Sequence, residues 1–100
     1  MGLNSKQFAF SLMLAQLIIF IYSKGYTCSI GDVWAKKGEG RRHSINSTPY
    51  DTLASDINLF KDGAYLTSKE DHAIFGAFWK SIGGTWGGDW KNGDANHYQI

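Results

Sequence analysis

Two acidic residues and one histidine are the side chains in this sequence best suited to chemistry. Asp94 stands three residues before His97 in the stretch DANHY. If His97 binds a metal ion, a carboxylate at this spacing can reach water on that metal. It can then act as general base and later as acid to a leaving amine. Short acid-to-histidine spacings are common, so the pair by itself does not establish a site.

Asp56 is the second acidic candidate, because it interrupts the apolar stretch LASDINLF over residues 53–60. A carboxylate in such a segment is costly to bury unless it is paired, hydrogen-bonded or bound to a metal. It can equally face solvent on the polar side of a half-buried strand. The local pattern leaves both interpretations open.

The loop over residues 83–90 comes shortly before the Asp94–His97 pair and consists mainly of glycine and tryptophan. Such glycines indicate tight turns, which Trp86 and Trp90 would pack. The same aromatic rings could instead form one wall of a substrate groove. Trp86 is therefore a candidate substrate-binding residue.

The remaining histidines and the single cysteine show no catalytic pattern. His43 and His72 are isolated, and His72 is expected to be exposed at the start of a helix. Cys28 has no histidine at a recognisable spacing and is predicted to be a buried thiol. The sequence contains no phosphate-binding glycine loop and no nucleophilic serine motif.

The elements that must position these residues are short. The patterns predict a helix over 5–24 and then a strand over 26–30, which a turn at Gly31-Asp32 ends. A strand over 53–60, a turn at 61–63 and a strand over 64–66 are predicted to form a hairpin. A second helix, capped by Thr67 or Ser68, is predicted to run to residue 82, and a strand over 97–100 follows. This order predicts one small α+β domain over residues 1–100, with a short antiparallel sheet and two main helices.

The apolar run over residues 8–22 has three competing interpretations. It is shorter than the roughly 20 residues of a membrane span, and no small-residue cleavage site follows it as in a signal peptide. As a core helix, it would be capped by Ser5 and ended by Gly25, and one face would carry Phe8, Leu12, Ala15, Ile19 and Tyr22. The caps favour a core helix within the domain, and the secretory or anchor interpretation stays open.

Composition excludes some classes of function. Ten basic and nine acidic residues give a net charge of +1, without a basic stripe, so no nucleic-acid partner is predicted. One cysteine cannot form an intrachain disulfide framework. The four Trp, five Tyr and six Phe residues can fill the core of a small domain.

Four stretches in order carry a resemblance to a known family. They are LIIFIYSKGYTCSIGD over 17–32, DINLFKDGAYL over 56–66, FWKSIGGTWGGDW over 78–90 and DANHY over 94–98. The chain resembles the VanY-like D-alanyl-D-alanine carboxypeptidase and L-alanyl-D-glutamate endopeptidase family, especially small phage endolysins, over nearly its whole length. The resemblance implies a Hedgehog/DD-peptidase-like fold and one zinc ion. It also implies that Asp56 and His97 are zinc ligands and that Asp94 is the catalytic base.

One position departs from the family pattern. The family stretch Ser-x-His…Ala-x-Asp reads STPYDTLASD over residues 47–56, so Ser47 matches and Pro49 stands where the first histidine ligand is expected. Proline has no ligating side chain, and a catalytic zinc site normally has three protein ligands. The chain is then inactive, or His43 substitutes for the missing ligand, or Pro49 is a variant of histidine. The family's arginine after the first strand is also absent, and Arg41, Arg42 or Lys36 is a candidate to bind substrate carboxylates.

The resemblance implies a monomeric zinc metallopeptidase that cuts peptidoglycan stem peptides, as phage or prophage endolysins do. Such a protein would wait in the cytoplasm until it is released to the cell wall. Two alternatives remain: a non-catalytic cell-wall-binding relic of the same fold, and a small membrane-inserting protein that uses residues 8–22. The first alternative rests on Pro49 and the second on the apolar run.

Overall fold

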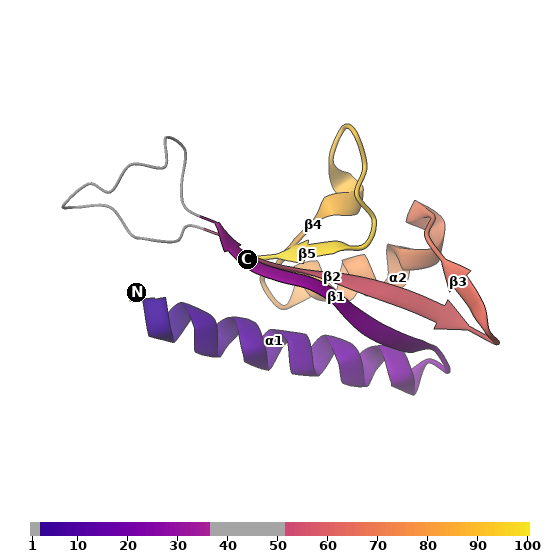
Figure 1. Cartoon of the computed structure of the whole chain (residues 1–100), viewed down its shortest axis with the longest axis horizontal. Helices are drawn as coiled ribbons and strands as arrows, with labels where there is room; N and C mark the ends of the chain where they lie inside the picture. Colours follow the sequence, from indigo (N-terminus) through magenta and orange to yellow (C-terminus); the bar gives the residue numbers. More distant parts are fainter. Residues whose placement is uncertain (1–2, 37–51) are drawn as a thin grey trace.

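The structure is a computed structural model that describes residues 3–36 and 52–100. Its elements are α1 (Leu3–Ser23), β1 (Thr27–Lys36), β2 (Thr52–Lys61), β3 (Ala64–Leu66), α2 (Lys69–Ser81), β4 (Thr85–Trp86), the 3-10 turn η1 (Gly87–Asp89) and β5 (His97–Gln99). The strands form one five-stranded sheet in the order β1-β2-β5-β4, with β3 paired to the end of β2 (Figure 1). All the pairings are antiparallel. The predicted α+β fold, with two helices and a short antiparallel sheet, is confirmed.

The central strand β2 separates a core face from a face that bears the candidate site. Leu53, Ile57 and Leu59 are buried on one face, because side chains alternate along a strand with a period of two. Asp56 lies between them on the opposite face and is only partly buried. The strand therefore carries apolar anchors and a carboxylate on different sides of the sheet.

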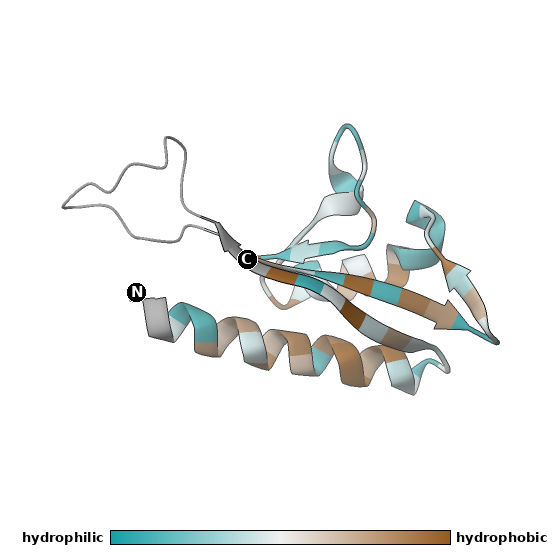
Figure 2. Cartoon of the chain, viewed as in Figure 1, coloured by the Kyte–Doolittle hydropathy of each residue, from teal (hydrophilic) through white to brown (hydrophobic). Residues whose placement is uncertain are grey.

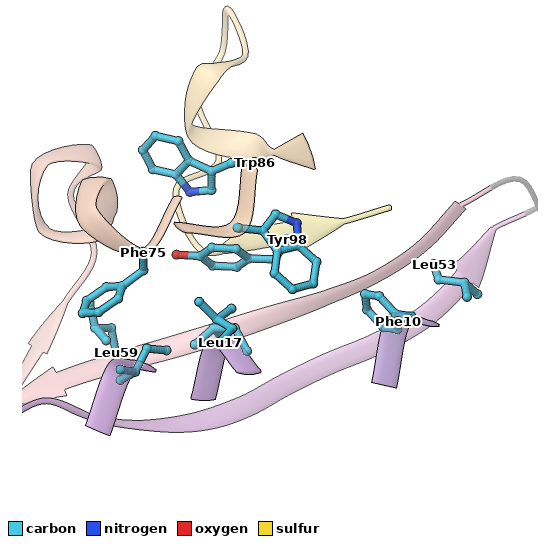
Figure 3. Packing of buried hydrophobic residues seen from close by; sticks show 10 residues of the cluster. Phe10, Leu17, Leu53, Leu59, Phe75, Trp86 and Tyr98 are labelled. Carbon is cyan, nitrogen blue, oxygen red and sulfur yellow. The ribbon is translucent and has the colours of Figure 1, made fainter. Parts of the chain in front are cut away.

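Both helices pack on the apolar face of the sheet and form one aromatic-rich core (Figure 3). Phe10 of α1 meets the ring of Trp79 edge-on, with 6.1 Å between the centroids. Phe20 stacks on Phe78 of α2 at 4.3 Å. Such pairs add about 0.5–1.5 kcal/mol each beyond the area that they bury. These contacts hold α1 against α2.

The sequence pattern assigned the wrong face of α1 to the core. Phe8 is 71% exposed and Ile19 is 69% exposed, and Leu12 and Tyr22 also lie on this outer face. The buried residues of the helix are Phe10, Leu17 and Ile21. The helix is apolar almost all round, as the colouring in Figure 2 shows. Periodicity therefore could not choose which side faces the sheet.

The predicted end of α1 is confirmed and its predicted start is wrong. The N–H of Tyr26 donates to the carbonyl of Ile21, and that of Gly25 donates to Tyr22. Gly25 has φ +87°, so the helix ends in a Schellman motif, which favours glycine at this position. Ser5 cannot cap the helix, because α1 already includes Leu3.

The predicted turn at Gly31-Asp32 is also wrong, because β1 continues to Lys36. The pairing with β2 instead shifts register between Ile30 and Val33, as in a β-bulge. Gly31 lies against the Cβ of Asp56, and a Cβ on Gly31 would be 3.3 Å from it. The glycine therefore marks a close approach within a strand, a role that resembles a turn signal in sequence.

The hairpin and the second helix are confirmed. Asp62 and Gly63 have φ of +52° and +82°, as a two-residue turn between twisted strands requires. Ser68 caps α2, and its side chain and that of Asp71 exchange hydrogen bonds with each other's backbone N–H.

Candidate functional site

Strands β2 and β5 bring Asp56 and His97 together. The two residues pair directly across the antiparallel ladder, and directly opposed side chains point to the same face of a sheet. The Oδ1 of Asp56 lies 3.8 Å from the Nδ1 of His97. Although 41 residues separate them in sequence, the register of two strands makes them neighbours.

Asp94 reaches the same imidazole nitrogen from the turn before β5. Its Oδ2 lies 3.9 Å from the Nδ1 of His97. The turn is held by its backbone, since the N–H of His97 donates to the carbonyl of Asp94 at 3.0 Å and the N–H of Asp94 donates to the carbonyl of Gly87 at 2.9 Å. The three candidate residues therefore converge on one side of the His97 ring.

Gly87 is required by this close packing. A Cβ at Gly87 would overlap the carbonyl oxygen of Asp94 and would lie 2.9 Å from the Cβ of His97. Any side chain at this position would push the acid and the histidine away from their present places. The glycine-rich loop thus positions the site through its backbone.

Gln99 orients the ring of His97, and sequence reasoning missed it. Its Oε1 lies 2.6 Å from the Nε2 of His97. An amide oxygen only accepts hydrogen bonds, so Nε2 carries a proton, and Nδ1 is the nitrogen that faces the two carboxylates. Residues two apart on a strand share a face, and this spacing in HYQ is the signal that could have found Gln99.

Trp90 borders the site, whereas the sequence pattern favoured Trp86 as the substrate-binding candidate of this loop. Its ring lies 4.8 Å from that of His97, between centroids, and 41% of the residue is exposed. Trp90 is therefore the tryptophan of the glycine-rich loop that borders the histidine and still meets solvent.

The assignment of Trp86 to a substrate groove is wrong, because Trp86 is only 4% exposed. Its ring fills the space over Gly76 and Gly88, where any Cβ would overlap it. Its Nε1 donates to the carbonyl of Ala95 at 2.7 Å. Trp86 therefore anchors the Asp94 turn from inside the core.

The site is electrostatically suited to a cation. Partial burial raises the pKa of Asp56, and the negative charge of Asp94 raises it further. His97 lowers the pKa of Asp56, while Asp32 of β1 adds to the increase. A carboxylate whose pKa is raised by neighbouring acids lies where a positive ion is favourable.

Asp56 and His97 supply one oxygen and one nitrogen donor, which fits two of the ligands of a zinc ion. Within residues 3–36 and 52–100, no group of three His, Cys, Asp or Glu side chains is arranged to hold a metal. Pro49, the candidate substitute His43 and the candidate substrate-binding residues Arg41, Arg42 and Ser47 all lie outside the described residues. The described residues thus provide two side chains able to bind a metal ion and a neighbouring acid.

The prediction that His72 is exposed is wrong. The side chain is fully buried beneath β5, where its Nδ1 lies 2.8 Å from the hydroxyl of Tyr98 and its Nε2 lies 3.2 Å from the carbonyl of Leu66. The carbonyl can only accept, so Nε2 carries the proton and Tyr98 donates to Nδ1. Burial lowers the pKa of His72. Helix α2 turns this residue inward, whereas its place in the first turn suggested a solvated position.

The predicted burial of Cys28 is only partly right. The residue is half-buried, and burial raises the pKa of its thiol. A thiol that resists ionisation is a poor nucleophile. Cys28 therefore plays no part in the site.

A groove of about 260 Å³ opens beside Asp94. It is lined on one side by Tyr65, Leu66 and Thr67 and on the other by Gly93, Asp94, Ala95 and Asn96. One wall thus comes from the end of β3 and the other from the turn that carries the acid. The groove therefore adjoins Asp94, one of the three candidate residues.

Comparison with known families shows to which family the chain is related. The model of the family described as D-alanyl-D-alanine carboxypeptidase matches residues 41–100. The chain belongs to this family. The matched part contains Asp56, Asp94 and His97, whereas α1 and β1 precede it. The expected likeness over nearly the whole chain is thus shown for these 60 residues, and a search of curated proteins finds no match.

Membership of the carboxypeptidase family makes the chain a peptidase by descent. It also supplies a reason for the geometry of the site. A histidine oriented by Gln99, a half-buried carboxylate and an exposed acid lie together on one sheet face. Acids and a histidine arranged in this way are suited to hydrolysis.

Proposed function

We propose that this chain is a zinc-dependent metallopeptidase that acts on peptidoglycan stem peptides. The observation that carries the proposal is the convergence of Asp56 and Asp94 on the Nδ1 of His97, at 3.8 and 3.9 Å. The family description, which names a D-alanyl-D-alanine bond, supports a cell-wall peptide as substrate. An endolysin that stays in the cytoplasm until its release to the cell wall is the form of this function that the sequence resemblance favours.

Each residue of the site has a distinct role in this proposal. His97 and Asp56 would hold the zinc ion, which when bound polarises the scissile carbonyl and makes water easier to deprotonate. Asp94 accepts the proton from the attacking water and then donates it to the leaving amine. Its side chain is 52% exposed against 26% for Asp56, so Asp94 is the carboxylate better placed to meet both water and substrate.

Pro49 limits the activity of this chain. It stands where the family pattern has a histidine ligand, and its ring offers no donor to a metal. Structural zinc sites provide about 10–16 kcal/mol in total, so loss of one ligand should cost several kcal/mol. The proposed enzyme therefore binds zinc weakly and cleaves slowly.

Metal content tests the proposal directly. We expect the purified protein to contain much less than one zinc per chain, and the Pro49→His variant to contain about one. Pro49→Ala is the matched control, because it removes proline without adding a ligand. His43→Ala in the unmodified chain tests the substitute ligand, since it removes any zinc that His43 helps to bind.

Hydrolysis of purified stem peptides is the second measurement. Pro49→His should cleave faster than the natural chain, and adding Asp94→Asn should abolish this gain while zinc stays bound. If the natural chain already holds one zinc and lyses cell walls, the role given to Pro49 is wrong. If Pro49→His binds no zinc, the assignment of Asp56 and His97 as ligands is wrong.

A non-catalytic cell-wall-binding protein is the second candidate, and the replacement of the histidine by Pro49 is the observation that favours it. The groove beside Asp94 can hold a peptide without any metal. Co-sedimentation with insoluble peptidoglycan separates the two candidates. Binding without cleavage, in both the natural chain and Pro49→His, supports the second candidate and contradicts the first.

A further inference from the structure

A chain of side-chain hydrogen bonds crosses three strands beside the candidate site. Asn58 lies two residues after Asp56 on β2, so both side chains point to the same face of the sheet, about 6.8 Å apart along the strand. The Nδ2 of Asn58 donates to the hydroxyl of Ser29 on β1 at 3.3 Å. Its Oδ1 accepts from the hydroxyl of Tyr65 on β3 at 3.3 Å. These two contacts hold the amide of Asn58 next to Asp56.

The amide of Asn58 has further hydrogen-bonding capacity. An asparagine side chain has two N–H donors and two acceptor lone pairs, and the contacts with Ser29 and Tyr65 use one of each. A peptide group offers the complementary pair, one N–H and one carbonyl. Because Asn58 is only partly buried, its amide is suited to bind the main chain of a peptide that lies on this face of the sheet.

Gly31 keeps the space beside Asp56 and Asn58 clear. A Cβ on Gly31 would lie 3.3 Å from the Nδ2 of Asn58 and 3.3 Å from the Cβ of Asp56, so a side chain at this position would crowd both residues. The glycine is exposed and lies in the bulge of β1. Bulges are frequent beside active sites, and a glycine inside a strand often marks a place where a ligand approaches closely. This part of the sheet is therefore open to a ligand.

Tyr65 connects this hydrogen-bond chain to the groove beside Asp94. The residue is 55% exposed, and it lines the groove together with Asp94. Its ring lies 5.1 Å from that of Phe60, between centroids, so β2 supports the ring while the hydroxyl donates to Asn58. The same residue thus holds Asn58 and forms part of the groove wall.

A purely structural role explains little of this arrangement. Backbone ladders already join β1 to β2 and β2 to β3. The two side-chain hydrogen bonds are long, at 3.3 Å, and exposed. Such bonds add little to stability, because water competes for the same groups.

We propose that Asn58, held by Ser29 and Tyr65, binds a main-chain peptide group of the stem peptide about two residues from the bond that is cut. The spacing follows from the strand, because an extended peptide advances as far per residue as β2 does. This inference rests on the proposed function and deepens it, since it states where the substrate crosses the sheet. Asn58 is thereby a substrate-binding residue, and Tyr65 is a positioning residue that acts through it.

Binding of the pentapeptide L-Ala-γ-D-Glu-L-Lys-D-Ala-D-Ala to the natural chain tests the proposal without metal or cleavage. In a nuclear magnetic resonance titration, Asn58→Ala should bind it about fivefold to tenfold more weakly, because a donor and an acceptor are lost. Tyr65→Phe keeps the ring and removes only the hydroxyl, so the affinity should fall about twofold to threefold. Gln7→Ala is the matched control, since it removes an exposed amide from α1, and it should bind as the natural chain does.

Ester analogues of the pentapeptide separate direct contact from an indirect effect. Each analogue replaces one peptide N–H by oxygen, which removes a donor with little change in shape. For one analogue the effect of Asn58→Ala should largely disappear, because the contact with Asn58 is already lost. For the other analogues the effect should persist. A residue with a purely structural role would weaken the binding of every analogue by the same factor.

Kinetics in the Pro49→His background give a second readout. A contact remote from the bond that is cut is the same in the ground state and in the transition state. Asn58→Ala should therefore raise KM about fivefold to tenfold and leave kcat nearly unchanged. A fall in kcat with KM unaltered would contradict the role given to Asn58.

Equal affinity for the pentapeptide in the natural chain and in both variants would overturn the proposal, as would a loss in Asn58→Ala that is the same for every ester analogue. Absence of pentapeptide binding by the natural chain would also overturn it. If near-ultraviolet circular dichroism shows that Asn58→Ala does not fold, Tyr65→Phe with the ester analogues supplies the same comparison.

The experiments distinguish failure of this inference from failure of the proposed function. Zinc-dependent cleavage by Pro49→His, with an unaltered KM after Asn58→Ala, would refute only the role of Asn58. Failure of Pro49→His to bind zinc would refute the proposed function. The titrations with the natural chain would still decide whether Asn58 binds the peptide.

Discussion

At the scale of the residue, His97 is held from two sides. Gln99 accepts from Nε2 at 2.6 Å, while the carboxylates of Asp56 and Asp94 lie near Nδ1. This arrangement keeps a proton on Nε2 and turns Nδ1 toward the proposed metal position. A partner on the second nitrogen is a regular feature of histidines that bind metals. Gln99 is therefore a positioning residue of the site.

Loss of this partner should weaken the metal site without removing a ligand. In the Pro49→His background, Gln99→Leu should lower zinc affinity by about 10- to 100-fold, measured by competition with a chelator. Nitrogen chemical shifts of His97 should show that the Nε2-protonated tautomer is no longer dominant. Gln99→Glu keeps an acceptor oxygen and should retain most of the affinity. Equal zinc affinity in the Leu and Glu variants would contradict this role.

At the scale of the element, short signals set where each segment begins and ends. The capping box of Ser68 and Asp71 starts α2, and the left-handed residues Asp62 and Gly63 reverse the chain before β3. Gly87 lets η1 pass close to Asp94 and His97. Each signal acts through the backbone, so neighbouring sequence is sufficient to recognise most of them.

Removal of the α2 cap should therefore cost stability locally. Ser68→Ala leaves the N–H of Asp71 without its side-chain acceptor and should lower the free energy of unfolding by about 1 kcal/mol. Thr67→Ala is the control, since Ser68 and not Thr67 is the cap, and it should have little effect. Urea unfolding followed by circular dichroism measures both. A larger loss in Thr67→Ala would show that the cap is wrongly assigned.

The close packing of η1 against Asp94 and His97 should likewise be disturbed by one added methyl group. Gly87→Ala should destabilise the fold by about 1–3 kcal/mol and displace Asp94 from His97, which the zinc content of the Pro49→His background would report. Gly63→Ala also strains its backbone, at φ +82°, but lies in the β2–β3 turn. It should lower stability and leave zinc binding intact. Unchanged zinc content in Gly87→Ala would contradict the positioning role of Gly87.

At the scale of the whole molecule, the sheet separates an apolar layer from a charged one. Both helices and the core lie on one side, and Asp56 and His97 face the other. His72 bridges the parts by accepting from Tyr98 of β5 and donating to Leu66, at the end of β3. Its burial as a neutral ring ties the stability of the whole fold to pH.

The direction of this dependence follows from the lowered pKa of His72. Above pH 6.5, the ordinary pKa of histidine being about 6.5, the His72 ring is neutral in both the folded and the unfolded states, and the full stability is present. As pH falls below that value, the unfolded state takes up a proton first and the fold loses stability. Thermal unfolding should thus show a falling midpoint below about pH 6.5. His72→Gln should flatten this slope, and an unaltered slope would contradict the assignment.

The sequence by itself determined the order of elements and the identity of the acids and histidine at the site. Caps, turn residues and a period of two are local, so α2, the hairpin, β2 and β5 could be predicted from them. The structure alone decided what depends on contacts between distant segments. Strand register placed Asp56 beside His97, and packing buried Trp86 and His72.

The helix α1 shows the same division most clearly. Its existence and its end at Gly25 follow from an apolar run and one glycine. Its orientation does not, because a helix that is apolar all round carries no preferred face in its sequence. Contacts with Trp79 and Phe78 turned Phe10 and Phe20 inward. The stripe predicted to lie in the core was thereby left on the outside of the molecule.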